Sequence, residues 1–263
     1  MNSQAARRRH PAALMLLLLG ALAIIATIYA LVNTSTAARA AGSPPSETAV
    51  EEGKALYLEG CASCHGLNAE GTTVAPSLIG AGAASVHFQV STGRMPVAAP
   101  AVQIERKDPS YTEPQIAALA AYIASLGPGP AIPTAEELDT TNADLAVGGE
   151  LFRTNCAQCH NFAGSGAALT EGKYAPSLME ATPQQVYEAM LTGPQNMPVF
   201  GDGTLGVSEK QDILKYVGHL QTQTQPGGWA LGSFGPVVEG ALLFTLGLGL
   251  LAGLAIWIGA KVR

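Results

Sequence analysis

Hydrophobic residues are concentrated at the two ends of the chain. From Ala12 to Val32 the sequence runs 21 residues without a charged side chain, and a second uncharged run extends from Gly240 to Ala260. As a helix, each run is long enough to cross a hydrocarbon core of about 30 Å. We therefore expect an N-terminal and a C-terminal transmembrane helix, with a structure of another kind between them.

Basic residues flank the outer ends of both runs. The first run is preceded by Arg7, Arg8, Arg9 and His10, and the second run is followed by Lys261 and Arg263. The positive-inside rule then predicts a multi-pass protein of the cell membrane, with both termini in the cytoplasm and residues 33–236 on the outer face. Trp229 and Trp257 fall where the two interfaces of the second helix should lie. The alternative for the first run is a cleaved signal peptide, cut among the small residues 37–41, and the middle is exported in either case.

The exported middle contains an internal repeat. The stretch GKALYLEGCASCH at residues 53–65 returns 95 residues later as GGELFRTNCAQCH at residues 148–160. The register is kept by Gly53/Gly148, Leu56/Leu151 and Tyr57/Phe152, a spacing that predicts two short helices with the same buried face. Further on, APSL occurs at 75–78 and 175–178, and MPV occurs at 95–97 and 197–199.

Each half is expected to close on an amphipathic helix opened by a capping box, at residues 112–115 and 208–211. The apolar stripes of these helices correspond: Leu119, Tyr122, Ile123 and Leu126 against Ile213, Tyr216, Val217 and Leu220. Glycine and proline at 127–133 indicate a linker. The predicted order is a cytoplasmic flank and transmembrane helix (1–32), a linker (33–46), a first domain (47–127), a linker (128–145), a second domain (146–222), a linker (223–239) and a transmembrane helix (240–263).

Charge adds one constraint on partners. Residues 33–236 hold 19 of the 20 acidic residues but only nine of the 14 lysines and arginines, a net charge of −10. Such a surface argues against nucleic acid as a partner. It can orient a basic redox partner, or it can simply keep the exported region soluble.

All four cysteines fall inside two Cys-x-x-Cys-His motifs. The motifs are Cys61, Cys64 and His65 in the first domain, and Cys156, Cys159 and His160 in the second. This spacing suits covalent attachment of haem c, because two thiols add to the two vinyl groups while the adjacent histidine is held beneath the iron. Two haem groups would also give these small helical domains the apolar interior that they lack. The alternatives are a thioredoxin-like dithiol, which needs a βαβ context, a zinc site, or disulfides.

A methionine opposite the histidine is typical of electron-carrying haem. Met95 is the one methionine of the first domain, with His87 as its competitor. In the second domain Met197 shares the Met-Pro-Val context, whereas Met179 and Met190 are expected to be core side chains.

The axial histidines need an acceptor for their second ring nitrogen. The matched Pro76 and Pro176 are candidates to supply it through their carbonyl groups, or they only shape the loop. His219 is expected to be structural. With both axial positions filled, neither iron offers a site for substrate, so the sequence predicts electron transfer without substrate chemistry.

Taken together, the repeat and the two terminal runs resemble the dihaem cytochrome c subunit of the actinobacterial cytochrome bcc complex, the menaquinol reductase joined to a terminal oxidase. The resemblance covers nearly the whole chain, and its most specific part is the dihaem repeat with the C-terminal helix. It implies an all-α fold of two tandem class I cytochrome c domains flanked by transmembrane helices. It also implies two haem c groups, held by Cys61, Cys64, His65 and Met95 and by Cys156, Cys159, His160 and Met197.

The same resemblance implies a place in aerobic respiration. One haem would accept electrons from the Rieske iron–sulfur subunit beside cytochrome b, and the other would pass them to the copper centre of a cytochrome c oxidase within a supercomplex. The assembled complex would act as a translocase. The alternatives are a membrane-anchored dihaem subunit of another dehydrogenase or oxidase and, more distantly, a haem-free thiol oxidoreductase.

Overall fold

The computed structural model describes residues 11–40, 46–223, 231 and 236–261 of the 263-residue chain. The basic flank with Arg7, Arg8, Arg9 and His10, and also Trp229 and Arg263, lie outside the described residues. The described chain is mostly helical, and its contacts divide it into two compact units. Unit 1 takes residues 1–87 and 111–132, and unit 2 takes residues 88–110 and 133–263.

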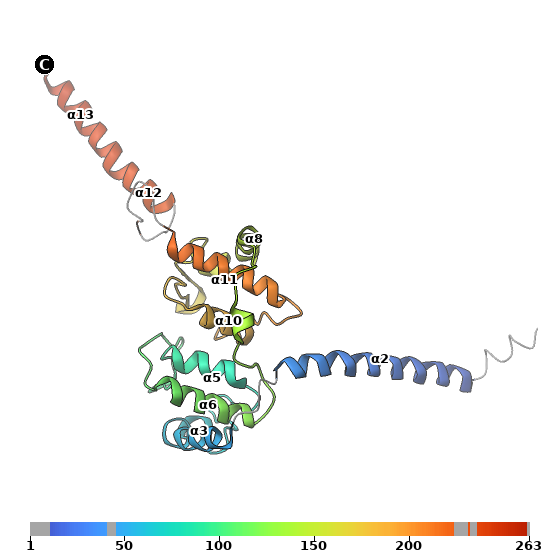
Figure 1. The fold of residues 1–263 in the computed structure, drawn as a ribbon. Coiled ribbons are helices and arrows are strands. Elements are labelled where there is room, and N and C mark those ends of the chain that lie inside the picture. The colour runs from blue at the N-terminus through green and yellow to red at the C-terminus, as the bar shows by residue number, and fades with distance from the viewer. Residues whose placement is uncertain (1–10, 41–45, 224–230, 232–235, 262–263) are drawn as a thin grey trace, which may run out of the picture. The chain divides into compact units, whose positions relative to one another are not determined.

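Unit 1 is built around the crossing of two helices, α3 (Glu47–Gly60) and α6 (Glu113–Ser125) (Figure 1). A side chain at Gly53 would overlap the carbonyl oxygen of Ala118, so the close approach requires glycine. One turn later the rings of Tyr57 and Tyr122 pack with their centroids 5.3 Å apart. The short helix α4 (Ala62–His65) also belongs to this unit, and the helix α5 (Gly82–Ser91) passes from unit 1 into unit 2 at residue 88.

Unit 2 repeats this crossing with α8 (Leu145–Asn155) and α11 (Val207–Thr222). A side chain at Gly148 would overlap the carbonyl oxygen of Asp212, and the rings of Phe152 and Tyr216 lie 5.3 Å apart. The prediction of two helices with the same buried face is therefore confirmed. The other helical elements of this unit are α7 (Ala135–Leu138), α9 (Ala157–His160), the 3₁₀ turn η1 (Thr170–Gly172) and α10 (Pro183–Thr192).

Two details differ from the sequence prediction. The capping box of α6 is present, since Gln115 accepts the backbone N–H of Thr112 at 2.9 Å. The box predicted at Ser208 is wrong: α11 begins at Val207, and Glu209 accepts the N–H of its N-cap, Gly206, at 2.6 Å. A glutamate at the third position after Gly206 satisfies that amide, which moves the start of the helix upstream.

The second difference is a short antiparallel hairpin in the otherwise helical unit 2. The strands β1 (Ala167–Ala168) and β2 (Tyr174–Ala175) pair Ala167 with Ala175 and Ala168 with Tyr174. Each strand is only two residues long. No period-2 pattern of that length can be recognised in a sequence.

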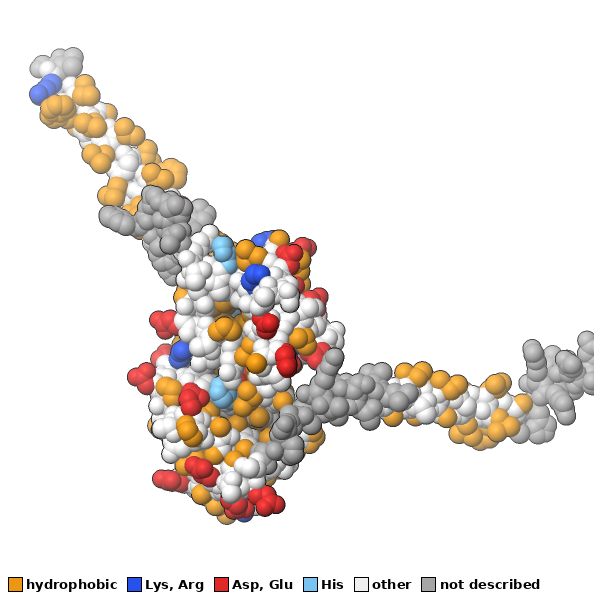
Figure 2. Space-filling model, in the orientation of Figure 1, with side chains coloured by type: hydrophobic (Ala, Val, Ile, Leu, Met, Phe, Trp, Pro, Cys, Tyr) orange, Lys and Arg blue, Asp and Glu red, His pale blue; other side chains and the backbone are white. Residues whose placement is uncertain are grey.

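Among the described residues, one helix is long and apolar enough to cross a membrane. It spans Val237–Lys261, with a mean hydropathy of 2.3, and consists of α12 (Pro236–Leu242), a π-helical turn (η3, Leu243–Gly247) and α13 (Leu248–Lys261). The N-terminal helix α2 (Pro11–Ala40) contains the shorter apolar stretch Met15–Ala30. Figure 2 shows hydrophobic side chains along both helices. The fold thus supports association with a membrane through the C-terminal helix, whereas the expected second span stays a proposal.

Candidate haem-binding sites

The two Cys-x-x-Cys-His motifs adopt the same backbone. Cys61 ends α3 by donating its N–H to Tyr57, and Cys156 ends α8 by donating to Phe152, both at 2.8 Å. From each of these cysteines a single turn, α4 or α9, leads to the histidine, whose N–H bonds back to the first cysteine. The close helix crossing thus positions both cysteines and the histidine on one short turn in each repeat.

Both histidines are buried, and each donates its Nδ1–H to a proline carbonyl. The distances are 2.8 Å from His65 to Pro76 and 2.9 Å from His160 to Pro176. A carbonyl can only accept, so this bond fixes the tautomer and leaves the lone pair of Nε2 for a metal ion. Burial also lowers the pKa of His160, which favours the neutral form of its imidazole.

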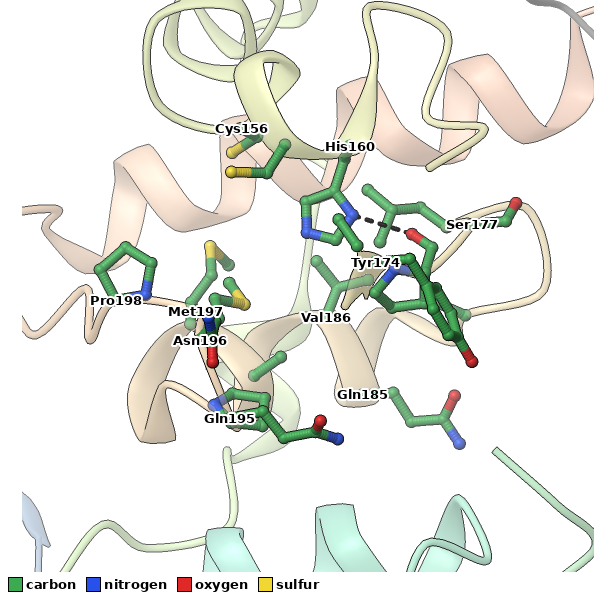
Figure 3. A pocket seen from close by; sticks show the side chains of 18 of the residues that line it. Cys156, His160, Tyr174, Ser177, Gln185, Val186, Gln195, Asn196, Met197 and Pro198 are labelled. Atoms are coloured by element: carbon green, nitrogen blue, oxygen red, sulfur yellow. Dashed lines mark hydrogen bonds between the residues drawn. The ribbon is translucent and has the colours of Figure 1, made fainter. Parts of the chain in front are cut away.

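A cavity of about 270 Å³ in unit 2 contains the second motif. Figure 3 shows His160 and Met197, which come from different elements, facing the same space, with Cys156 at its edge. Much of the apolar lining comes from α8, α10 and α11: Phe152, Val186, Ala189, Met190, Ile213 and Val217. This volume far exceeds the roughly 30 Å³ that one water molecule occupies in the liquid, so the cavity suits a cofactor better than a single ion.

These residues fit a covalently bound haem. Two thiols, a neutral imidazole and a thioether sulfur converge on an apolar cavity, which is the donor set of a haem c with methionine as the sixth ligand. Met190 also lines the cavity and is 1% exposed in the apolar core of unit 2, whereas Met179 is not part of the lining. Met197 therefore shares the cavity with a second methionine.

The first motif lies in unit 1 together with Pro76, whereas Met95 lies in the segment 88–110, which belongs to unit 2. The pairing of Met95 with His65 stays a prediction. His87, the competing ligand, has its Nε2 3.9 Å from a carboxylate oxygen of Glu113. His219 is exposed on α11, with its ring 6.5 Å from that of Tyr216.

The alternatives to haem find little support in this geometry. Within the described ranges, no group of three or more His, Cys, Asp or Glu side chains could hold a zinc ion. Burial raises the pKa of Cys61, and it raises that of Cys156 to about 11. Redox-active dithiols need a lowered pKa, because the thiolate is the nucleophile.

Sequence reasoning missed part of the cavity lining. Arg94, Gln103 and Arg106 also line it, although they belong to the first repeat in sequence. Burial, with the positive charge of Arg106, lowers the pKa of Arg94. No periodic signal marks these residues, since they lie in an irregular segment whose position depends on long-range contacts.

Comparison with known proteins agrees with this reading of the two halves. Residues 50–127 match the family described as "Cytochrome c", and residues 143–217 match "Cytochrome C oxidase, cbb3-type, subunit III". Cytochrome c domains imply covalent haem c, and the two Cys-x-x-Cys motifs fit two such groups.

Whole-chain relatives carry the name "Cytochrome bc1 complex cytochrome c subunit". The protein of Mycobacterium leprae is 48% identical over 254 residues, which are 94% of this chain and 87% of the relative. That of Mycobacterium tuberculosis is 45% identical over 261 residues (97% and 92%), and that of Corynebacterium efficiens is 44% identical over 251 residues (90% and 85%). With both haem motifs inside two cytochrome c domains, the chain belongs to the family of cytochrome c subunits of the cytochrome bc1 complex.

Proposed function

We propose that this chain is the dihaem subunit of a menaquinol:cytochrome c reductase, the bcc form of the bc1 complex, and carries electrons from its Rieske iron–sulfur subunit to a terminal oxidase. The observation that carries this proposal is the shared geometry of the two repeats. Each holds a Cys pair beside a buried histidine whose Nδ1 is bound to a proline carbonyl. Two sites of this kind in one chain suit passage of electrons from one to the other.

The residue roles follow from that geometry. Thioether bonds at Cys61 and Cys64, and at Cys156 and Cys159, would hold the two haem groups, and Nε2 of His65 and of His160 would bind iron. Met95 and Met197 would supply the sixth ligands, while the carbonyls of Pro76 and Pro176 orient the histidines. When bound, haem supplies a reversible one-electron change at iron, and filled axial positions make the chain a carrier without substrate chemistry of its own.

The arrangement in the membrane is part of the proposal. Two spans, 12–32 and 240–260, would place the haem domains 47–127 and 146–222 on the outer face and both termini in the cytoplasm. Cytochrome b and the Rieske subunit would be neighbours within the complex, and a cytochrome c oxidase would join it as a supercomplex. The assembly as a whole, not this chain alone, would be the translocase.

One observation favours a second candidate. Residues 143–217 match a family described as a subunit of a cbb3-type cytochrome c oxidase. The second candidate is therefore a membrane-anchored dihaem subunit that belongs to an oxidase or another dehydrogenase.

The test is to tag the C-terminus, extract membranes in mild detergent, and identify the copurifying proteins while recording the haem spectrum of the sample. Cytochrome b, a Rieske protein and oxidase subunits in the eluate are the expected result. A dehydrogenase or an oxidase alone would overturn the assignment to the reductase and leave a dihaem carrier. Absence of covalent haem from the denatured chain would overturn both candidates.

A further inference from the structure

The segment 88–110 forms a wall of the cavity in unit 2, although it belongs to the first repeat. The side chain of Gln103 makes a pair of hydrogen bonds with the backbone of Tyr174 on strand β2, both at 2.7 Å. The amide of Gln195 donates to the carbonyl of Ile104 at 3.0 Å, and Arg106 donates to the side chain of Gln185 at 3.3 Å. These contacts hold the segment against α10 and the loops on either side of it.

The wall lies across the cavity from the cysteines. In Figure 3, Gln185 and Gln195 are on the side of the cavity opposite Cys156. Both of these glutamines bond the segment 88–110. Thioether bonds fix the vinyl edge of a haem at the cysteines, and the two propionates leave from the opposite edge of the ring. The propionates of a haem held by Cys156 and Cys159 would therefore point toward this segment.

Two arginines of this segment, Arg94 and Arg106, line the cavity. Arg94 lines the cavity at 8% exposure, its guanidinium 5.1 Å from the ring centroid of Phe88. Arg106 also lines the cavity, and its side chain is exposed. Across the described parts of the chain, no carboxylate lies within ion-pair distance of either guanidinium. A buried cation without a counter-charge is costly, and an anionic ligand in the cavity would offset that cost.

We propose that Arg94 and Arg106, supplied by the first repeat, bind the two propionates of the haem attached to Cys156 and Cys159. A guanidinium matches a carboxylate with two parallel hydrogen bonds, and burial strengthens the attraction. The two arginines are positioning residues: they orient the ring in the cavity, and their charge favours the reduced iron, which carries one positive charge fewer. The second haem site is thus complete only with residues from the first half of the chain.

This inference rests on the proposed function in one respect, that haem occupies the cavity. The test uses the tagged full chain in its detergent-extracted complex and compares Arg94→Gln, Arg106→Gln and the rescue variant Arg94→Lys. The control is Arg153→Gln on α8, which makes the same change in charge but does not line the cavity. The readouts are covalent haem per chain, the two midpoint potentials, and the propionate bending modes in the resonance Raman spectrum. The potential of the second haem is identified as the one that moves in Met197→Ala.

We expect Arg94→Gln to lower the midpoint of the second haem and shift a propionate mode, with a smaller effect of Arg106→Gln because that side chain is solvated. Arg94→Lys should recover most of the potential, since it keeps the charge. The inference would be overturned if the midpoint potential of the second haem shifted no more in Arg94→Gln than in Arg153→Gln, or if only the first haem shifted. Missing haem at the second motif in the unmodified chain would overturn the proposed function instead, so the two failures are distinguishable.

Discussion

The two repeats share their helix crossing but differ in the loop after the histidine. In both, a glycine permits close approach of the closing helix and an aromatic pair packs at 5.3 Å. Pro76 follows His65 by eleven positions, whereas Pro176 follows His160 by sixteen. The longer second loop contains the hairpin β1–β2, whose Tyr174 bonds Gln103.

The repeat thus preserves the carbonyl that orients the histidine and changes the residues around it. A proline carbonyl meets Nδ1 in both halves in spite of the different loop lengths. The hairpin, by contrast, occurs in unit 2, where the backbone of its Tyr174 bonds Gln103 in the segment 88–110 of the first repeat.

Removing the second pair of thiols should have the largest effect. In Cys156→Ser/Cys159→Ser, covalent haem should fall from two groups per chain to one, and unit 2 should unfold at a lower temperature because its cavity loses an apolar filling. Pyridine haemochrome spectra and a thermal melt followed by circular dichroism measure both. The matched variant Cys61→Ser/Cys64→Ser should also lose one haem. Retention of two haem groups in either variant would contradict the attachment sites.

The helix crossing should be the next most sensitive feature. A valine at Gly148 would overlap the carbonyl oxygen of Asp212, so Gly148→Val should lower the free energy of unfolding by about 3 kcal/mol. Gly53→Val should destabilise unit 1 in the same way, because its side chain would overlap the carbonyl oxygen of Ala118. The control is Gly218→Ala in α11, where a Cβ meets no atom within 4 Å, and it should stabilise by about 0.5–1 kcal/mol. Equal melting temperatures for Gly148→Val and the control would refute the packing argument.

The methionines should affect redox potential without affecting attachment. Met95→Ala and Met197→Ala should each lower one midpoint by on the order of 0.1 V, a fraction of the roughly 0.8 V range that axial ligands span. Haem content should stay at two per chain, because the thioether bonds do not involve methionine. Met190→Ala tests the competing sulfur in the second cavity and should leave both potentials nearly unchanged. If Met190→Ala moves a midpoint and Met197→Ala does not, the ligand assignment is wrong.

Loss of the contact between Gln103 and the hairpin should have the smallest effect on stability. Gln103→Ala removes two hydrogen bonds near the surface and should cost about 1 kcal/mol. Gln103→Glu keeps the acceptor for the N–H of Tyr174 but loses the donor to its carbonyl, so it should cost about half as much. Hydrogen exchange at the Tyr174 amide measures the difference. Unchanged protection in Gln103→Ala would show that the segment 88–110 does not depend on this contact.

Local signals in the sequence were sufficient for the motifs and the helices that carry them. The register of Gly53 with Gly148 and of Tyr57 with Phe152 predicted two short helices with the same buried face, because matching residues recur at the same spacing in both halves. The Cys-x-x-Cys-His spacing likewise predicted the residues for haem attachment in each half. The predicted start of α11 at Ser208 was wrong because Gly206 and Glu209 make an equally local cap two residues earlier.

The residues that enclose the second cavity could not all be predicted from the sequence. Arg94, Gln103 and Arg106 carry no periodic pattern, and their place depends on Tyr174, Gln185 and Gln195, which follow them by more than 70 residues. Such contacts form between side chains and irregular backbone, for which a sequence holds no repeating signal. The sequence therefore predicts the two motifs and the helices that carry them, whereas long-range contacts place residues from the first half of the chain in the wall of the second cavity.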